Sequence, residues 1–150
     1  MSTTDTLSDK ERLARLRLIR TANIGAVTFW ALLERYGDAV TALAALPDLA
    51  RKRGARPVKL PTEQETVAEL ECTAAAGARL ITHGEADYPQ GLAELDVPPP
   101  VVTVRGNAKL FARETIAIVG ARNASALGQR FARDIARDLG AAGVVVVSGL

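Results

Sequence analysis

Two short apolar runs near the end of the 150-residue chain constrain its fold most strongly. Residues 116–119 read Ile-Ala-Ile-Val, and residues 144–147 are four valines. Unbroken runs of apolar, mostly β-branched residues are expected of strands that are buried on both faces of a parallel sheet. Between them, residues 125–141 carry apolar side chains four positions apart, which marks one face of a helix. Strand, helix and strand within about thirty residues predict one βαβ unit of a Rossmann-like parallel sheet.

A glycine-containing turn, residues 120–128, links the first of these strands to the helix. In an open α/β sheet this loop lies at the carboxyl end of the strands, where ligands bind. Gly120 permits the tight turn, Ser125 can cap the helix, and Arg122 offers a planar guanidinium suited to phosphate. Free amides at the helix N-terminus also favour an anion. The pattern is consistent with an anion site, and a plain turn with an exposed arginine is the alternative.

The spacing in this loop argues against a nucleotide. Arg122 holds the position of the second glycine in G-x-G-x-x-G, so a dinucleotide pyrophosphate would meet a side chain. The Gly-Lys-Ser/Thr of a phosphate-binding P-loop is also missing after Gly120. His83 is the only histidine, and no cluster of metal-ligating residues has the usual spacing. We therefore expect no dinucleotide or ATP cofactor and no metal.

Residues 1–60 are predicted to form a helical module. Ser8 and Glu11 have the spacing of a capping box, which would start a helix that runs to about residue 22. Residues 23–25, Asn-Ile-Gly, interrupt it, and a second helix is expected over residues 26–36. This order of helix, short loop and helix resembles a helix-hairpin-helix (or SAM-like) module.

Two more short helices are expected within the same module. Asp38 is placed to cap one that ends near residue 46, and Pro47 to open another that ends at Gly54. Trp30 is expected to anchor the core. Residues 55–61 have the composition of a linker.

Residues 61–150 are predicted to be the first part of the Rossmann-like domain. Thr62 and Glu65 repeat the capping-box spacing and start a helix to about residue 76, on which Cys72 is expected to be a small buried thiol. Short strands are expected at 79–82 and 101–104. Because two parallel strands do not make a stable sheet, we expect these 150 residues to be the truncated front of a longer protein.

Charge is divided into three blocks along the chain. Residues 1–61 carry 11 basic and 6 acidic groups, residues 62–104 carry one and 8, and residues 105–150 carry 7 and 3. Two basic segments around an acidic one are compatible with a polyanionic partner. The arginines at 130, 133 and 137 alternate with aspartates, so a self-neutralised helix face is expected there. Phe131, on the apolar face of that helix, is expected to be a core residue.

The N-terminal hairpin has two possible roles. Its loop could contact DNA phosphate with help from Arg17, Arg20 and Arg35, although Asn23 stands where the first glycine of such a loop would be. Alternatively, the module packs or docks a partner.

Composition excludes several classes of protein. The hydrophobic content, 48%, is too high for a disordered chain. The apolar stretches fall well short of the roughly 18 residues that a membrane span needs. The polar N-terminus lacks the apolar core of a secretory signal, and a single cysteine cannot form an internal disulfide. We therefore expect a cytoplasmic protein.

Five short motifs follow one another in a fixed order along the chain. They are Ile24-Gly25 with residues 32–37, Asp87-Tyr88-Pro89, Pro98-Pro99 with residues 104–107, residues 116–122 ending in Gly-Ala-Arg, and Ser148-Gly149-Leu150. In this order they resemble the DNA-processing protein A (DprA/Smf) family. The resemblance covers the chain from about Leu13 to Leu150.

The resemblance implies a non-enzymatic, single-stranded DNA-binding protein of natural transformation and recombination, which protects the strand and loads the RecA recombinase. It implies a basic DNA pocket in the Rossmann-like domain and a homodimer at full length. Carried over to this sequence, the DNA-binding candidates are Gly120, Ala121, Arg122, Ser125, Ser148 and Gly149. Arg122 is the expected phosphate contact. The alternatives are a nucleotide-processing, phosphoribohydrolase-like enzyme on a related fold and a fragment that acts only as a protein-interaction module.

Overall fold

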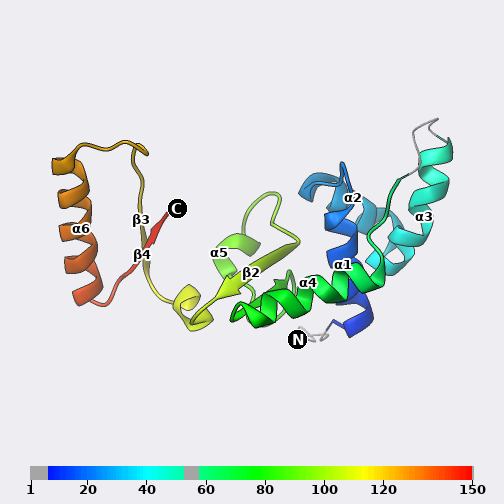
Figure 1. The fold of residues 1–150 in the computed structure, drawn as a ribbon, viewed down its shortest axis with the longest axis horizontal. Coiled ribbons are helices and arrows are strands. Elements are labelled where there is room, and N and C mark those ends of the chain that lie inside the picture. Colours follow the sequence, from blue (N-terminus) through cyan, green and yellow to red (C-terminus); the bar gives the residue numbers. More distant parts are fainter. Residues whose placement is uncertain (1–6, 53–57, 150) are drawn as a thin grey trace. The chain divides into compact units, whose positions relative to one another are not determined.

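A computed structural model of the protein describes residues 7–52 and 58–149. The chain forms two compact units, Met1–Ala108 and Lys109–Leu150 (Figure 1). A helical N-terminal part and a later part with parallel strands confirm the predicted mixed α/β class. The predicted helix end at Gly54 and most of the predicted linker lie outside the described residues.

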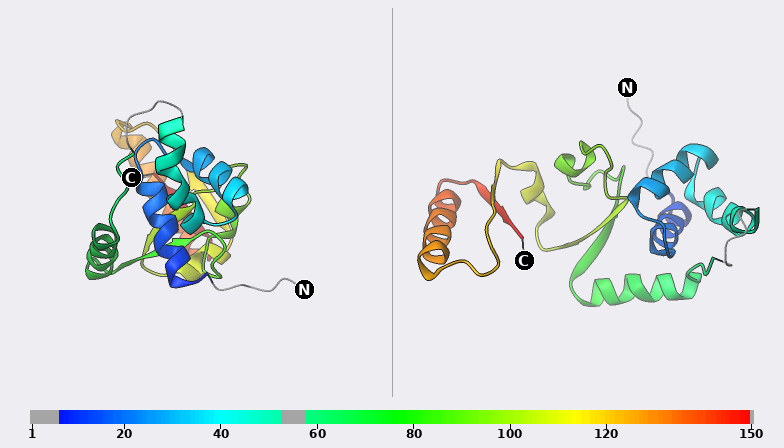
Figure 2. Two further views of the ribbon diagram at one scale, coloured as in Figure 1. Left: turned by 90° about the vertical axis from the view of Figure 1, so that its right-hand side faces the viewer. Right: turned by 90° about the horizontal axis from the view of Figure 1, so that it is seen from above.

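Three helices form the core of the first unit: α1 (Asp9–Arg20), α2 (Ala26–Tyr36) and α3 (Ala39–Lys52). They lie side by side (Figure 1, Figure 2). Each contributes a fully buried side chain to one apolar cluster: Leu18, Phe29 and Ala42. The predicted helical module is therefore present, and burial of one face of each helix holds it together.

Helix α3 is one continuous helix where the sequence predicts two. Pro47, expected to open a separate helix, lies inside it. Leu43, Leu46 and Ala50 are all buried and share the face that packs on the core. Burial of this continuous apolar face stabilises the helix by more than it loses through the one backbone hydrogen bond that proline cannot donate. The prediction of a break at this position is wrong.

The start of α1 differs from the predicted capping box in one partner. The Ser8 hydroxyl accepts the Glu11 amide at 3.2 Å, as predicted. The Glu11 carboxylate does not return to Ser8; its two oxygens accept the Ala39 amide at 3.0 and 3.1 Å, and one accepts Nε of Arg15 at 2.8 Å. Glu11 therefore caps the start of α3, because a buried carboxylate is stabilised there by a free amide and a cation.

The rest of the first unit consists of α4 (Glu63–Ala75), β1 (Ala78–Thr82), the short α5 (Gln90–Ala93) and β2 (Val101–Arg105). The capping box at the start of α4 is complete, as predicted. Strands β1 and β2 pair antiparallel, and Ile81, Tyr88 and Val104 form a second small core. Both strands belong to the first compact unit, so the compact units divide after Ala108. The predicted domain division at residue 60 stays a prediction.

Cys72 on α4 is exposed, so the prediction of a buried thiol is wrong. Only one face of α4 contacts its neighbours, α1 and β1, and Thr66 is its one buried residue. A helix that packs on one side only leaves most of its small residues in solvent.

The second unit contains the predicted βαβ unit. A 3-10 helix, η1 (Ala108–Ala112), precedes β3 (Thr115–Ile118), α6 (Ala126–Ala141) and β4 (Val145–Ser148), and the two strands pair in parallel. The predicted burial is wrong for the described residues: Ile116 is 45% exposed, Val119 88% and Phe131 64%. In this part of the chain one helix faces two strands, so apolar side chains have no second layer to pack on.

Candidate nucleic-acid interface

The predicted site residues gather at one edge of the two-stranded sheet in the second unit. In the register of β3 and β4, Ile118 is the partner of Ser148, so the two strands end together. Gly120, Ala121, Arg122 and Ser125 lie on the loop that follows β3, and Gly149 follows β4. Parallel strands have their carboxyl ends at the same edge, so all six predicted residues lie on the two chain segments that leave the sheet at this edge.

Ser125 begins α6 as predicted. Its hydroxyl accepts the Gly128 amide at 3.2 Å. The amides of Ala126 and Leu127, in the first turn, have no partner inside the helix, because an α-helix leaves its first amides unsatisfied. The sequence predicts free amides at this helix start, and the cap at Ser125 identifies them as those of Ala126 and Leu127. Together with the helix dipole they favour an anion at this end of α6.

Arg122 is exposed on this loop and has no hydrogen-bond or ion-pair partner among the described residues. Two other arginines of the second unit donate hydrogen bonds to backbone carbonyls. Arg113 donates to the Gly143 carbonyl, and Arg133 donates to the Gln129 carbonyl at 3.2 Å. Arg122 is therefore available to an anion at the carboxyl edge.

The arginines on α6 are only partly neutralised. Arg137 forms ion pairs of 3.1 Å with both Asp134 and Asp138. Arg130 and Arg133 contact neither aspartate among the described pairs, so the predicted self-neutralised face holds at Arg137 alone. The second unit, with 6 basic and 3 acidic residues in its sequence, keeps unpaired positive charge.

Unlike Arg122, the arginines Arg17 and Arg20 of α1 are paired with carboxylates of α4. Arg17 donates to the Pro61 carbonyl at 2.9 Å and pairs with Glu63 at 3.2 Å. Arg20 pairs with Glu69 at 2.7 Å. Both bonds tie α1 to the start and middle of α4. A DNA phosphate would have to displace these carboxylates, which disfavours Arg17 and Arg20 as DNA contacts.

The loop between α1 and α2 keeps a hairpin geometry despite its departure from the glycine pattern. Asn23 has φ of 65°, and among the described residues no other non-glycine has a positive φ. Asparagine adopts this left-handed conformation more readily than most residues. Gly25 then begins α2 without a side-chain cap. Asn23 therefore replaces the expected glycine without changing the turn.

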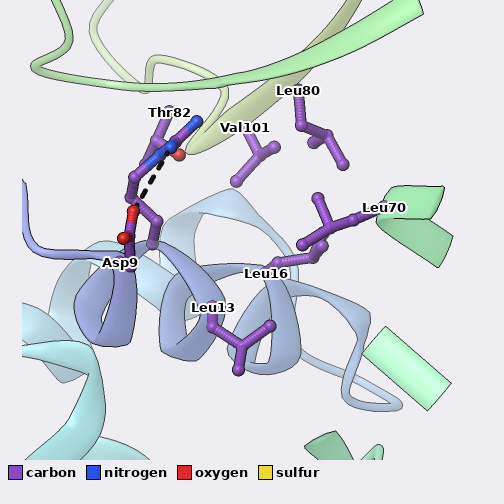
Figure 3. Close-up of a pocket in the computed structure, with 8 residues that line it drawn as sticks. Asp9, Leu13, Leu16, Leu70, Leu80, Thr82 and Val101 are labelled. Atoms are coloured by element: carbon purple, nitrogen blue, oxygen red, sulfur yellow. Dashed lines mark ion pairs between the residues drawn. The ribbon is translucent and has the colours of Figure 1, made fainter. Parts of the chain in front are cut away.

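A cavity of about 300 Å³ opens in the first unit where α1, α4, β1 and β2 meet (Figure 3). Its walls are mainly apolar: Leu13, Leu16, Leu70, Leu80 and Val101. Arg12 at its edge forms ion pairs with Asp9 at 3.7 Å and with Glu85 at 2.9 Å. Its charged groups are paired with one another, so the cavity offers no free cation to a nucleic acid.

The helical module with its hairpin between α1 and α2, followed by the βαβ unit, defines a mixed α/β protein. The model of the DprA-like N-terminal HHH domain matches residues 9–72, and the model of DNA recombination-mediator protein A matches residues 79–150. The chain belongs to the DprA/Smf family of DNA recombination mediators, as its motifs predict. No curated protein matches it.

No group of three or more metal-ligating side chains is found within residues 7–52 and 58–149. Over the same ranges, every helix is too short or too polar to cross a membrane.

Proposed function

We propose that the protein binds single-stranded DNA at the carboxyl edge of β3 and β4, protects the strand, and loads the RecA recombinase onto it without acting as an enzyme. The observation that carries the proposal is the exposed, unpartnered guanidinium of Arg122. Arg122 lies on the loop that leads into the first turn of α6, in a domain of the recombination-mediator family.

A DNA phosphate would be held by Arg122 and by the amides of Ala126 and Leu127. Gly120 and Ala121 bear little or no side chain, so the strand can approach the backbone. Apart from the glycine itself and its two chain neighbours, no described atom lies within 4 Å of the place where a Cβ at Gly120 or Gly149 would be. The hydroxyl of Ser148, which is exposed, can donate to a second phosphate oxygen.

Contacts of this kind read the phosphate backbone and not the bases, so binding would be independent of sequence and sensitive to salt. Preference for a single strand would come from unpaired bases, which can stack on the plane of an arginine guanidinium. We propose the cytoplasm as the place of action and a homodimer as the functional form.

Fluorescence anisotropy of labelled single-stranded and duplex oligonucleotides, titrated at two salt concentrations, tests the DNA-binding part. The expected result is salt-sensitive binding with preference for the single strand. Equal affinity for duplex, or no binding to either, contradicts it. A shorter lag in RecA assembly on the same strand tests loading, and sedimentation tests the dimer.

A further inference from the structure

The first unit has a second hollow, a groove of about 600 Å³ that is distinct from the leucine-lined cavity. One wall is the exposed side of α2, and the other is the segment that precedes β2 together with His83. The lining residues are Val27, Trp30, Ala31, Leu33 and Glu34 on one side and His83, Asp96, Val97 and Pro98 on the other.

The floor of this groove is fixed by aromatic contacts and a hydrogen bond. Nε1 of Trp30 donates to the Pro98 carbonyl at 2.8 Å, which ties the two walls together. The Trp30 and His83 rings meet edge to face with centroids 4.9 Å apart, and His83 meets Tyr88 in the same way at 5.0 Å. The groove is therefore preformed, and a ligand would not have to organise it.

The walls of the groove expose apolar surface. Val27 is 68% exposed and Val97 is 41% exposed, and they face the groove from opposite walls. Exposed apolar side chains that line one concave surface favour an apolar side chain as ligand.

The charged residues of the groove are acidic. Glu34 and Asp96 are exposed, and neither has a hydrogen bond or ion pair among the described residues. No lysine or arginine lines the groove within the described part of the chain. The carboxylates of Glu11, Glu63 and Glu69, by contrast, are all paired with arginines of α1. Two unpaired carboxylates repel phosphate and attract cations, so this surface is unsuited to DNA.

We propose that this groove binds a short peptide segment of a partner protein, one that inserts an apolar side chain between Val27 and Val97 and places lysine or arginine against Glu34 and Asp96. The site is a protein-docking surface in addition to the proposed DNA edge. Its apolar walls provide the anchor, and its carboxylates select basic neighbours of that anchor.

Panning a random 12-residue peptide library against the immobilised full chain tests the proposal. We expect enriched peptides to combine an apolar residue with lysine or arginine. Trp30 is the only tryptophan of the chain and lines the groove, so its fluorescence reports binding of tryptophan-free synthetic copies. A lack of enrichment, or enriched peptides without basic residues, would overturn the proposal.

Variants locate the binding. Glu34→Lys with Asp96→Lys should weaken the selected peptide at least about tenfold, and a peptide with its basic residues changed to glutamate should then bind better. Val27→Ser with Val97→Ser should weaken it similarly. The control is Glu71→Lys with Val67→Ser, two substitutions on α4, away from the groove. Val67 is matched to Val97 of the groove because each is 41% exposed. Equal loss in groove and control variants, each folded by circular dichroism, would contradict the assignment.

Discussion

The arginines of α1 and the arginine on the β3–α6 loop differ in their partners. On α1, Arg12, Arg15, Arg17 and Arg20 all pair with carboxylates, and three of those carboxylates come from the acidic block that follows residue 61. In the second unit, Arg122 and Arg130 have no partner among the described residues. Both segments are basic in sequence, and of these two groups of arginines only Arg122 and Arg130 are left without a carboxylate partner among the described residues. Net charge therefore identifies a nucleic-acid surface only after internal ion pairs have been subtracted.

The two units also differ in burial. Phe29 has no exposed surface, whereas Phe131 is 64% exposed. A phenylalanine ring is therefore expected to stabilise the fold much more at position 29 than at position 131. Among the variants proposed below, we expect the largest loss of stability at Phe29.

Replacement of Phe29 by alanine should lower the free energy of unfolding of the first unit by about 3–5 kcal/mol, because it leaves a cavity in the main core. Urea unfolding followed by Trp30 fluorescence measures it. The matched control is Phe131→Ala, which we expect to change this transition by less than about 0.5 kcal/mol. Similar shifts in both variants would contradict the contrast between the units.

Glu11→Ala should lower the free energy of unfolding of the first unit by about 2–4 kcal/mol. The substitution removes the buried carboxylate that both the Ala39 amide and Arg15 contact. Glu11→Gln keeps an acceptor for the amide and should cost less. The same unfolding measurement applies. If both variants unfold like the parent, Glu11 does not join α1 to α3.

The Arg20–Glu69 pair should contribute only about 0.2–1 kcal/mol, since both side chains are partly exposed. A double-mutant cycle of Arg20→Ala and Glu69→Ala isolates this coupling energy. A coupling energy near zero would mean that the pair does not hold α4, and Arg20 would again be a candidate for DNA.

A smaller effect is expected from pH. Burial, and then the nearby positive charge of Arg15, lower the pKa of His83. The unfolded chain takes up this proton near pH 6.5 and the folded chain only at lower pH, so the free energy of unfolding should fall between pH 7.5 and 5.5. His83→Phe keeps an aromatic ring beside Trp30 and removes the only histidine. If the free energy of unfolding falls just as steeply with pH in this variant, His83 is not the source of the pH dependence.

Local signals in the sequence predict much of this structure. Thr62 and Ser125 cap helices as their spacing indicates, and the apolar runs near residues 116 and 145 form paired parallel strands. Because that pairing puts the carboxyl ends of both strands at one edge, the sequence also predicts that the loop after β3 and the residues after β4 leave the sheet there.

Features that depend on distant partners could not be predicted. Glu11 caps a helix 28 residues away, and Arg20 pairs with Glu69 across 49 residues. Pro47 remains helical because neighbours on both sides of it are buried in the core. Helical propensity and capping patterns describe only a few successive residues, so they carry no information on these contacts.

The most direct test of the different use of arginines is the salt dependence of DNA affinity in two single variants, Arg122→Ala and Arg20→Ala. Anisotropy titrations of a labelled single strand over a range of salt concentrations give the slope of log affinity against log salt. Loss of one phosphate contact should reduce that slope by about one for Arg122→Ala. The slope should be unchanged for Arg20→Ala, whose cation is already paired. An unchanged slope for Arg122→Ala, or the same loss in both variants, would contradict the account.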